Sequence, residues 1–349
     1  MGSVCAVSGC YNERVSSSNG RKVTILDVAR AAGVSKSAVS LALRGDPGLG
    51  ERTRAAIVAE AQRLGYRQNR WARSLVQGRT GLVGVLLTDL SSDYQTEIVH
   101  GIEDAAEQVG LEVLLSHGRR DPAVLQRRLT QLGDLGVEGV VVLSAMLGPA
   151  VLARAATRQP MVVVGRVEGL PPGIGSVANH DEAGAQLAVQ HLVGIGHRRI
   201  AHLTMSQRAA ARARRRAYEE SMVGAGLGAF VQVAPEWDGG LDQLVAAAGE
   251  PDGPTAVFAS NDRGAAAVVA AALDRGLRVP EDLSVIGYDN TALAQVLRPA
   301  LTSVDQPRPQ MGRLAMDQLA ELMAGGEARH QVVEPELVVR GSVARRWGS

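Results

Sequence analysis

One short segment of the sequence carries side chains that suit contact with DNA. Lys36, Ser37, Ser40 and Leu41 share one arc of a helix with Arg44, at about 100° per residue. Cations on such an arc can bind phosphates, and short side chains can reach base edges in the major groove. We therefore predict major-groove contacts at the first four of these residues. The alternative is an ordinary αα-hairpin with a solvated face.

The elements that must position these side chains are two short helices around a tight turn, over Val23–Leu43. Thr24 can cap the first helix with its hydroxyl, and Gly33 can end it with a positive φ. Ser35 can cap the second helix, whose opposite arc is apolar and would pack on the first. A third helix is expected over about 51–64, ended by Gly65. Its inward residues are expected to be Thr53, Ile57, Ala61 and Leu64.

Charge is distributed unevenly along the 349 residues. The net charge is only +1, but residues 21–80 hold twelve basic and four acidic residues, a net charge of +8, which leaves −7 on 81–349. A basic head on an acidic body indicates a polyanion-binding module attached to another domain. The two cysteines, Cys5 and Cys10, cannot staple a core. Neither a signal peptide nor a long apolar run is present, so we expect a cytoplasmic protein without a membrane partner.

Four segments are expected along the chain. Residues 1–20 are expected to be a disordered tail, and 21–67 a helix-turn-helix DNA-binding domain. Residues 68–80 form a hinge segment that mixes arginines with apolar residues. They are either a basic linker or a segment that folds on DNA and wedges an apolar side chain into the minor groove. Residues 81–349 form a core of two subdomains.

Apolar runs alternate with amphipathic helices throughout this core, in two successive series. This βαβ rhythm predicts an α/β fold with parallel sheets covered by helices on both faces. Ligands bind at the carboxyl ends of such strands, so a cleft between the two subdomains is the expected site. The expected strands cover 82–87, 112–115, 139–143, 161–164, 199–203, 230–233, 256–259 and 283–287, and the expected helices cover 94–109, 122–135, 149–158, 182–194, 209–225 and 263–275.

Polar and aromatic residues gather where these strands end. Asp89 and Tyr94 follow the first strand, Arg166 follows another, and Asp262 and Asp289 follow two strands of the second series. Carboxylates, a guanidinium and an aromatic ring together suit a sugar or another polyol. Each residue has the alternative of capping a helix, which stays open for Asp89 and Asp289. No phosphate loop, metal-ligand motif or nucleophile motif occurs, so no cofactor or metal is expected.

Taken together, these features resemble the lactose-repressor (LacI-type) family of bacterial transcription regulators. The resemblance runs from Val23 to about Val343. It implies a small all-α helix-turn-helix head, a two-lobed periplasmic-binding-protein-like core and a homodimer on a double-stranded, pseudo-palindromic operator. The motifs that carry it are VTILDVARAAGVSKSAVS, LGYRQNRWARSL, GHRRIAHL, FASNDRGA and LSVIGYDN.

Two further features of the DNA contacts follow from the resemblance. Leu41 stands where the family usually has Arg. Because Leu touches only a thymine methyl or excludes a base sterically, the operator preference at that base pair is expected to be atypical. Gln68 replaces the usual Pro before the hinge, which leaves the linker less stiff. The hinge residues expected in the minor groove are Asn69, Ala72, Arg73 and Leu75, with Leu75 as the wedge.

The resemblance also implies a small-molecule effector in the cleft, a sugar as the first expectation. Trp237 would stack on a pyranose, and Asp262 and Arg212 would clamp hydroxyls. Two departures leave a non-sugar effector open: Gln95 replaces the second of two aromatic residues, and His180 replaces an Asp beside a helix cap. The effector contacts carried over are Asp89, Tyr94, Arg166, Arg212, Trp237, Asp262 and Gln306.

The function expected is that of a DNA-binding transcriptional regulator, a repressor, whose operator affinity an effector controls by changing the angle between the lobes. Whether the effector induces or co-represses stays open. The rival is a solute-binding protein or a sugar-modifying enzyme with a two-lobed core. The missing leader argues against transport, and the missing catalytic motifs argue against an enzyme. A dimer is expected because no heptad pattern follows Val343.

Overall fold

The computed structural model describes residues 23–66 and 79–346. Contacts divide the chain into two compact units, Met1–Gly78 and Arg79–Ser349, and each is described here by itself. The expected tail and the hinge residues Asn69, Ala72, Arg73 and Leu75 lie outside the described residues.

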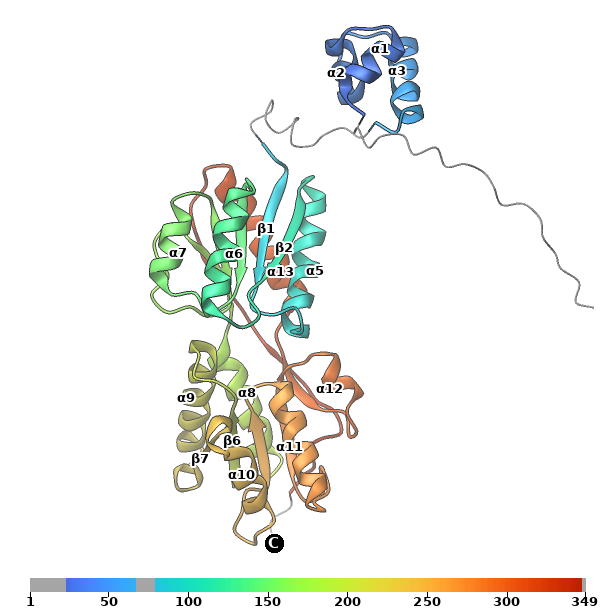
Figure 1. Ribbon diagram of the computed structural model, residues 1–349. Coiled ribbons are helices and arrows are strands. Elements are labelled where there is room, and N and C mark those ends of the chain that lie inside the picture. Colours follow the sequence, from blue (N-terminus) through green and yellow to red (C-terminus); the bar gives the residue numbers. More distant parts are fainter. Residues whose placement is uncertain (1–22, 67–78, 347–349) are drawn as a thin grey trace, which may run out of the picture. The chain divides into compact units, whose positions relative to one another are not determined.

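Residues 23–66 of the first unit contain three helices, α1 (Ile25–Ala32), α2 (Lys36–Arg44) and α3 (Glu51–Arg63), as the sequence predicts (Figure 1). They enclose a small core that includes the fully buried side chains of Val28 and Val39. The prediction for Thr53 is wrong. Thr53 is exposed because the first turn of α3 extends beyond the packed region, which begins after it at Ile57.

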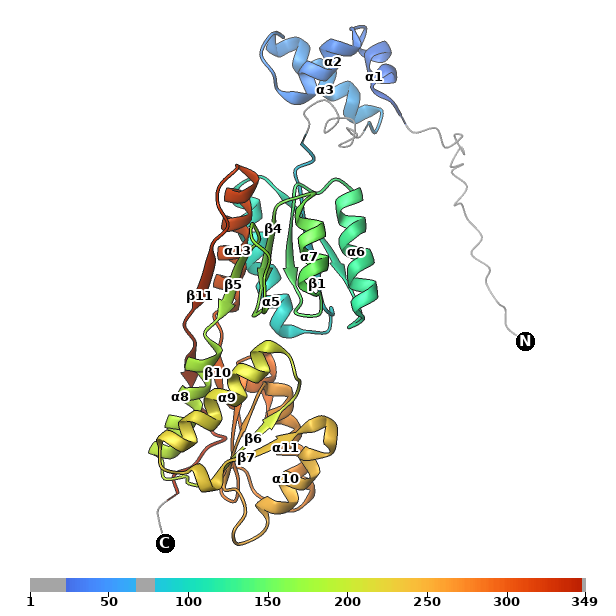
Figure 2. The same ribbon diagram turned by 90° about the vertical axis from the view of Figure 1, so that its left-hand side faces the viewer.

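The second unit contains two lobes, and the first is built on a parallel six-stranded sheet of order β11-β5-β4-β3-β1-β2. Helices α5 (Asp93–Gln108) and α13 (Arg308–Met323) cover one face of the sheet. Helices α6 (Pro122–Asp134) and α7 (Pro149–Ala156) cover the other (Figure 2). The strands are β1 (Leu82–Leu87), β2 (Glu112–His117), β3 (Gly139–Leu143), β4 (Met161–Val164), β5 (Gly175–Asn179) and β11 (His330–Val333).

The second lobe repeats this plan with the sheet order β12-β10-β9-β8-β6-β7, in which only the edge strand β12 is antiparallel to its neighbour. Its strands are β6 (Ile200–Thr204), β7 (Gln232–Pro235), β8 (Ala256–Ala259), β9 (Ser284–Asp289), β10 (Thr302–Asp305) and β12 (Glu336–Val338). Its helices are α8 (Asp181–Gly194), α9 (Ala209–Gly224), α10 (Gly240–Ala248), α11 (Asp262–Asp274) and α12 (Ala292–Val296), with short 3-10 turns η1 (Gly228–Phe230) and η2 (Glu236–Asp238).

The chain passes between the lobes after β5, after β10 and after β11. The two predicted α/β series are confirmed, but the chain beyond β9 was not predicted. There α13 and β11 return to complete the first lobe, and β12 returns to the second. These crossings bring strand ends of both lobes to one place. No helix within the two described ranges is long and apolar enough to cross a membrane.

Candidate functional site

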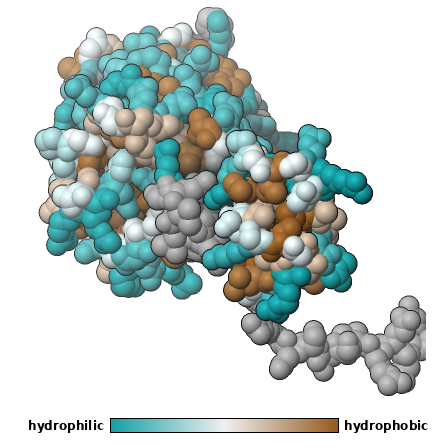
Figure 3. All heavy atoms as spheres, turned by 90° about the horizontal axis from the view of Figure 1, so that it is seen from above, coloured by the Kyte–Doolittle hydropathy of each residue, from teal (hydrophilic) through white to brown (hydrophobic). Residues whose placement is uncertain are grey.

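The expected DNA-contact face of the head lies on α2. Lys36 and Ser37 are exposed and Ser40 and Leu41 are half-buried, whereas Val39, on the opposite arc, is fully buried. Among the described residues, the Lys36 ammonium and the Ser37 and Ser40 hydroxyls have no hydrogen-bond partner. Hydrophilic residues project beside apolar ones on the head in the space-filling view (Figure 3). These polar groups are therefore free to bind another molecule.

The backbone of α2 is fixed at both ends. At the start, Ser35 Oγ accepts a hydrogen bond from the Ala38 N–H at 3.1 Å, as predicted. At the end, the Arg54 guanidinium of α3 donates to the Leu41 and Ala42 carbonyls, each at 3.2 Å, and to the Asp46 carbonyl. The Leu41 and Ala42 carbonyls also accept backbone N–H groups from Gly45 and Asp46 just after the helix, so Arg54 adds a charged donor to an end that the backbone already caps. The helix that presents Lys36 is thus held by its own neighbour.

Thr24 caps α1, as predicted, and Asp27 completes the cap. The Thr24 hydroxyl donates to the Asp27 carboxylate at 2.7 Å, and the Thr24 N–H donates to the same oxygen at 2.9 Å. Asp27 lies at the third position of the helix. The Thr24 side chain also accepts from the Asp27 backbone N–H, so the two residues form a reciprocal capping box, and the acidic side chain in the first turn suits the positive end of the helix dipole.

The second candidate site is a cavity of about 440 Å³ between the two lobes. It lies at the carboxyl ends of strands from both sheets, where the βαβ pattern predicts a ligand site. Its lining brings together five of the seven expected effector contacts, namely Asp89, Tyr94, Arg166, Asp262 and Gln306, and also Asp289.

A buried arginine from α9 forms the electrostatic centre of this cavity. The Arg214 Nε donates to Asp181 Oδ1 at 2.9 Å, and its Nη1 donates to the Ser260 carbonyl at 2.7 Å. Its guanidinium carbon lies 3.6 Å from the ring centroid of Tyr288. Burial works against this charge, but Asp181, Tyr288 and Asp289 keep the pKa of Arg214 above its usual value. The guanidinium is therefore a permanent cation fixed in position.

Asp289, the last residue of β9, faces this cation. Its Oδ1 lies 3.7 Å from Arg214 Nη1 and accepts a hydrogen bond from Gln306 Nε2 at 2.5 Å. Gln306 Oε1 accepts in turn from the hydroxyl of Tyr94, on α5 of the first lobe, at 3.2 Å. Burial raises the pKa of Asp289 to about 7, against the effect of Arg214. The cavity therefore contains one hydrogen-bonded chain that joins the two lobes.

Asp262 lines the cavity, but its carboxylate is engaged inside the second lobe. Oδ2 accepts from the Thr291 N–H at 2.7 Å and from the Thr291 hydroxyl at 2.9 Å, and Oδ1 accepts from the Ser303 hydroxyl at 2.6 Å. Burial raises the pKa of Asp262, and these donors oppose the rise. Asp262 thus fixes the turn after β9 that carries Asp289. Beside it, Asn261 is the N-cap of α11, and its Oδ1 accepts a hydrogen bond from the Gly264 N–H at 2.8 Å.

The remaining predicted residues of the first lobe form ion pairs at the cavity. Asp89 Oδ2 accepts from Arg120 Nε at 2.8 Å, and Arg166 Nη1 lies 2.7 Å from Glu182. The Ser91 N–H and the Arg120 guanidinium hold the pKa of Asp89 below its usual value. The helix-cap alternative fails for Asp89 and for Asp289, because Ser92 and Thr291 are the N-caps of the helices that follow.

Both departures from the family pattern have structural roles. Gln95 Oε1 accepts from the Thr88 and Asp89 N–H groups at 3.0 and 3.3 Å, and its amide donates to the Leu143 carbonyl. It thereby ties the ends of β1 and β3 where an aromatic ring was expected. His180 is the N-cap of α8, and its Nδ1 accepts from the Ala183 N–H at 3.3 Å.

Two expected effector contacts do not line the cavity. Arg212 donates to Glu168 Oε2 and to the Gln207 carbonyl, each at 2.6 Å, and Trp237 lies on η2 with 43% of its surface exposed. Arg214, two residues after Arg212, lines it instead. Arg214 was not predicted, although the sequence contains a signal for it. Arg214 belongs to a stripe at helical spacing that is buried in the structure, formed by Ala211, Arg214, Tyr218 and Met222.

Comparison with known proteins assigns the family. Residues 24–69 match the model of bacterial regulatory proteins of the lacI family, and 189–343 match a periplasmic binding protein-like domain. Catabolite control protein A of Priestia megaterium is 33% identical over 86% of this chain and 92% of that protein. The chain belongs to the LacI family of bacterial regulatory proteins. The ribose operon repressor of Escherichia coli is 33% identical over 91% of this chain and 99% of that protein.

Solved structures agree with this assignment. The Lac repressor dimer bound to operator and the anti-inducer ONPF has a TM-score of 0.82 at 29% identity, and the match covers 93% of this chain and all of that one. The transcriptional regulator CelR in complex with cellobiose has a TM-score of 0.65 at 31% identity, over 92% and 100% of the two chains. This LacI-family chain is therefore a DNA-binding transcriptional regulator with an effector-binding core. A solute-binding protein or a sugar-modifying enzyme is not favoured.

Proposed function

We propose that this regulator is a repressor that binds a pseudo-palindromic operator as a homodimer and responds to a sugar. Two features of the chain support the proposal: the free polar face of α2 and the polar cavity between the lobes. The relatives support it as well, because one solved structure is a repressor dimer on operator DNA and another regulator holds cellobiose. The domains proposed are the head at 21–67, the hinge at 68–80 and the core at 81–349.

In the head, Lys36 would bind phosphate, and Ser37, Ser40 and Leu41 would meet base edges. Phosphate contacts set affinity and register, whereas base contacts set specificity. Leu41 offers no donor to guanine, so thymine or steric exclusion would define its base pair. The hinge residues Asn69, Ala72, Arg73 and Leu75, outside the described residues, are proposed to enter the minor groove with Leu75 as the wedge.

In the core, the proposal of an effector site rests on the row of hydrogen bonds from Tyr94 through Gln306 to Asp289. This row joins both lobes, and its alternating donors and acceptors match the hydroxyls of a sugar. Asp89 and Arg166 add a carboxylate and a guanidinium, and Arg214 takes the place expected for Arg212. Asp262 acts as a positioning residue through Thr291. Trp237 is left out of the site because it does not line the cavity.

The control proposed is a coupling between the two sites. A sugar that binds one arrangement of the lobes more tightly than the other would shift the distance between the two hinges of a dimer, and with it the operator affinity. Such coupling is typically worth about 1–3 kcal/mol. We further propose that the protein acts in the cytoplasm and does not turn over its ligand.

The experiment is selection of operator sequences from a random double-stranded DNA pool with the purified full chain. We expect a palindrome to be enriched, and we expect its binding to persist when DNA from the unselected pool is added as competitor. Binding that is sensitive to salt but blind to sequence, with and without a panel of sugars, would contradict the proposal. A turnover assay on the same sugars tests the enzymatic rival, since only an enzyme consumes its ligand.

A further inference from the structure

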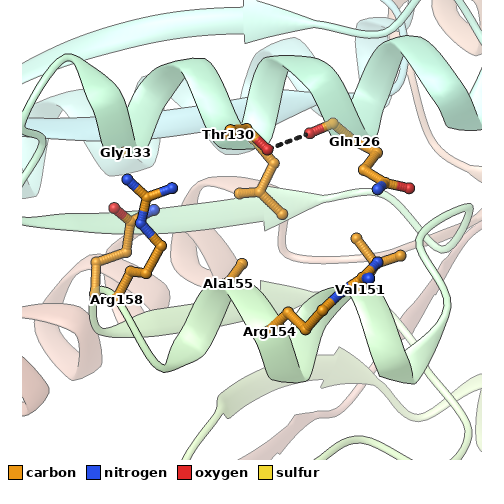
Figure 4. Close-up of a pocket in the computed structure, with 9 residues that line it drawn as sticks. Gln126, Thr130, Gly133, Val151, Arg154, Ala155 and Arg158 are labelled. Atoms are coloured by element: carbon orange, nitrogen blue, oxygen red, sulfur yellow. Dashed lines mark hydrogen bonds between the residues drawn. The ribbon is translucent and has the colours of Figure 1, made fainter.

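A second cavity lies on the outer face of the first lobe, in the groove between α6 and α7. Its volume is about 230 Å³. Figure 4 shows the two helices side by side, with Thr130 and Gln126 reaching down from α6 and Arg158 reaching up from the end of α7. The interlobe cavity shares none of its lining, which consists of Gln126, Leu129, Thr130, Gly133, Val151, Arg154, Ala155, Arg158 and Gln159.

One buried polar side chain in this groove lacks a partner. Gln159 is only 8% exposed, and its side-chain amide makes no hydrogen bond to any described residue. Its Oε1 packs under Gly133, where a Cβ would lie 3.1 Å away. Neither atom of this amide is fully enclosed, and Gln159 lines the groove. The amide nitrogen is therefore open to an acceptor such as a carboxylate oxygen.

Two cations complete the polar part of the groove. Arg154 donates no hydrogen bond to the described residues, and Arg158 Nη2 pairs with Asp134 Oδ1 at 2.8 Å. More than half of each of these paired side chains is exposed. Exposed ion pairs contribute little to stability, so Arg158 can exchange Asp134 for the carboxylate of a ligand at little cost. Leu129, Val151 and Ala155 supply apolar surface between the cations.

We propose that the groove between α6 and α7 is a second ligand site, specific for a small aromatic carboxylate. The guanidinium groups of Arg154 and Arg158 bind the carboxylate, and the apolar side chains contact the ring. A cavity of about 150 Å³ already holds a benzene ring, so the volume is sufficient. The site is independent of the function proposed for the head and the interlobe cavity.

The groove lies one short loop away from the point where the chain enters the core. After α6 the chain reaches Glu138, whose carboxylate accepts hydrogen bonds from the Gly81 N–H at 2.7 Å and from Arg79 Nε at 3.1 Å. The Thr80 hydroxyl donates to the Gly136 carbonyl at 2.7 Å. Occupancy of the groove should therefore slow amide exchange in α6, α7 and this loop.

Benzoate is the probe for the test, titrated calorimetrically into the full chain and followed by hydrogen exchange. We expect saturable binding with a dissociation constant of about 1 mM or below, and protection of α6 and α7. Arg154→Gln should weaken binding about tenfold, which is about 1.4 kcal/mol. Gln159→Leu should weaken it too. Arg127→Gln is the matched control, because Arg127 is an exposed arginine of α6 outside the groove.

Three results would overturn the proposal. The first is that benzoate shows no saturable binding. The second is that the wild type and Arg154→Gln bind benzoate with equal affinity. The third is that Gln306→Leu loses binding, which would assign benzoate to the interlobe cavity. Arg154 is exposed, so its variant should fold even where Gln159→Leu does not. Unchanged affinity in Arg127→Gln together with loss in Arg154→Gln supports the proposed site.

Discussion

The head and the interlobe cavity prepare their polar groups in opposite ways. On α2, Lys36, Ser37 and Ser40 have no hydrogen-bond partner among the described residues, and only the backbone is locked. In the cavity, Asp89 and Arg214 are already paired. The head therefore gains contacts without breaking any, which suits salt-dependent binding to phosphates. The cavity must exchange internal partners for a ligand, and that exchange favours a ligand that replaces every bond it breaks.

The largest effect expected concerns two arginines two residues apart. Arg214→Ala removes the buried cation that lies nearest to Asp181 and Asp289, so the core should lose about 3–5 kcal/mol of unfolding free energy. Arg212→Ala removes an exposed pair with Glu168 and an exposed hydrogen bond to the Gln207 carbonyl, and should cost about 1 kcal/mol or less. Chemical denaturation of both variants gives the comparison. Similar losses for the two would remove the distinction drawn between a buried and an exposed arginine.

A smaller effect is expected where α3 holds α2. Arg54→Ala removes the donor to three carbonyls at the end of α2, and we expect the head to lose about 1.5–3 kcal/mol. Operator affinity should fall with it, while the core melts as in the wild type. Arg52→Ala is the control, because Arg52 is exposed on the same helix. A head that melts equally in the two variants would show that α2 does not need this lock.

The cavity should also give the core a pH dependence. The pKa of Asp289 in the folded chain, about 7, lies above its usual 3.8. Between these values the folded chain keeps a proton that the unfolded chain loses, so stability falls as pH rises, by at most about 1.4 kcal/mol per pH unit. Asp289→Asn should flatten this fall, as measured by denaturation between pH 4 and about 8. An unchanged slope in the variant would contradict the burial of this carboxylate.

The smallest effect expected is at the contact between the lobes. Tyr94→Phe removes the hydroxyl that donates to Gln306 and should cost about 1 kcal/mol of effector binding or less. Competition titrations against the bound effector measure this loss of affinity. Gln306→Leu removes both hydrogen bonds of the Gln306 side chain and should weaken effector binding more. An effect of Tyr94→Phe that exceeds that of Gln306→Leu would contradict the proposed order of the contacts.

The sequence predicted the head well because its signals are local. Ser35 and Gly33 mark the ends of helices, and the apolar stripes of α1 and α2 have a clear period. The return of β11 to the first lobe was not predictable in this way. Its partner β5 lies about 150 residues earlier, in the register His330 to Ser176, and no local pattern encodes that pairing.

The cavity was predicted in outline and missed in part. Asp89, Tyr94 and Gln306 follow from their places after strands or from the resemblance, and the structure brings them together. Arg214 was missed because Arg212 was carried over by resemblance, although the buried stripe of α9 singles out Arg214. The groove that holds Gln159 depends on how α7 packs beside α6, which is a tertiary property that spacing along the chain does not reveal.

Coupling between the interlobe cavity and the head is tested by titrating each ligand in the presence of the other. With a selected operator and a sugar that binds, both affinities are measured with and without the other ligand. We expect the sugar to change operator affinity by a factor of about 5–150, and the operator to change sugar affinity by the same factor. A sugar that binds the free and the operator-bound protein equally would contradict this coupling.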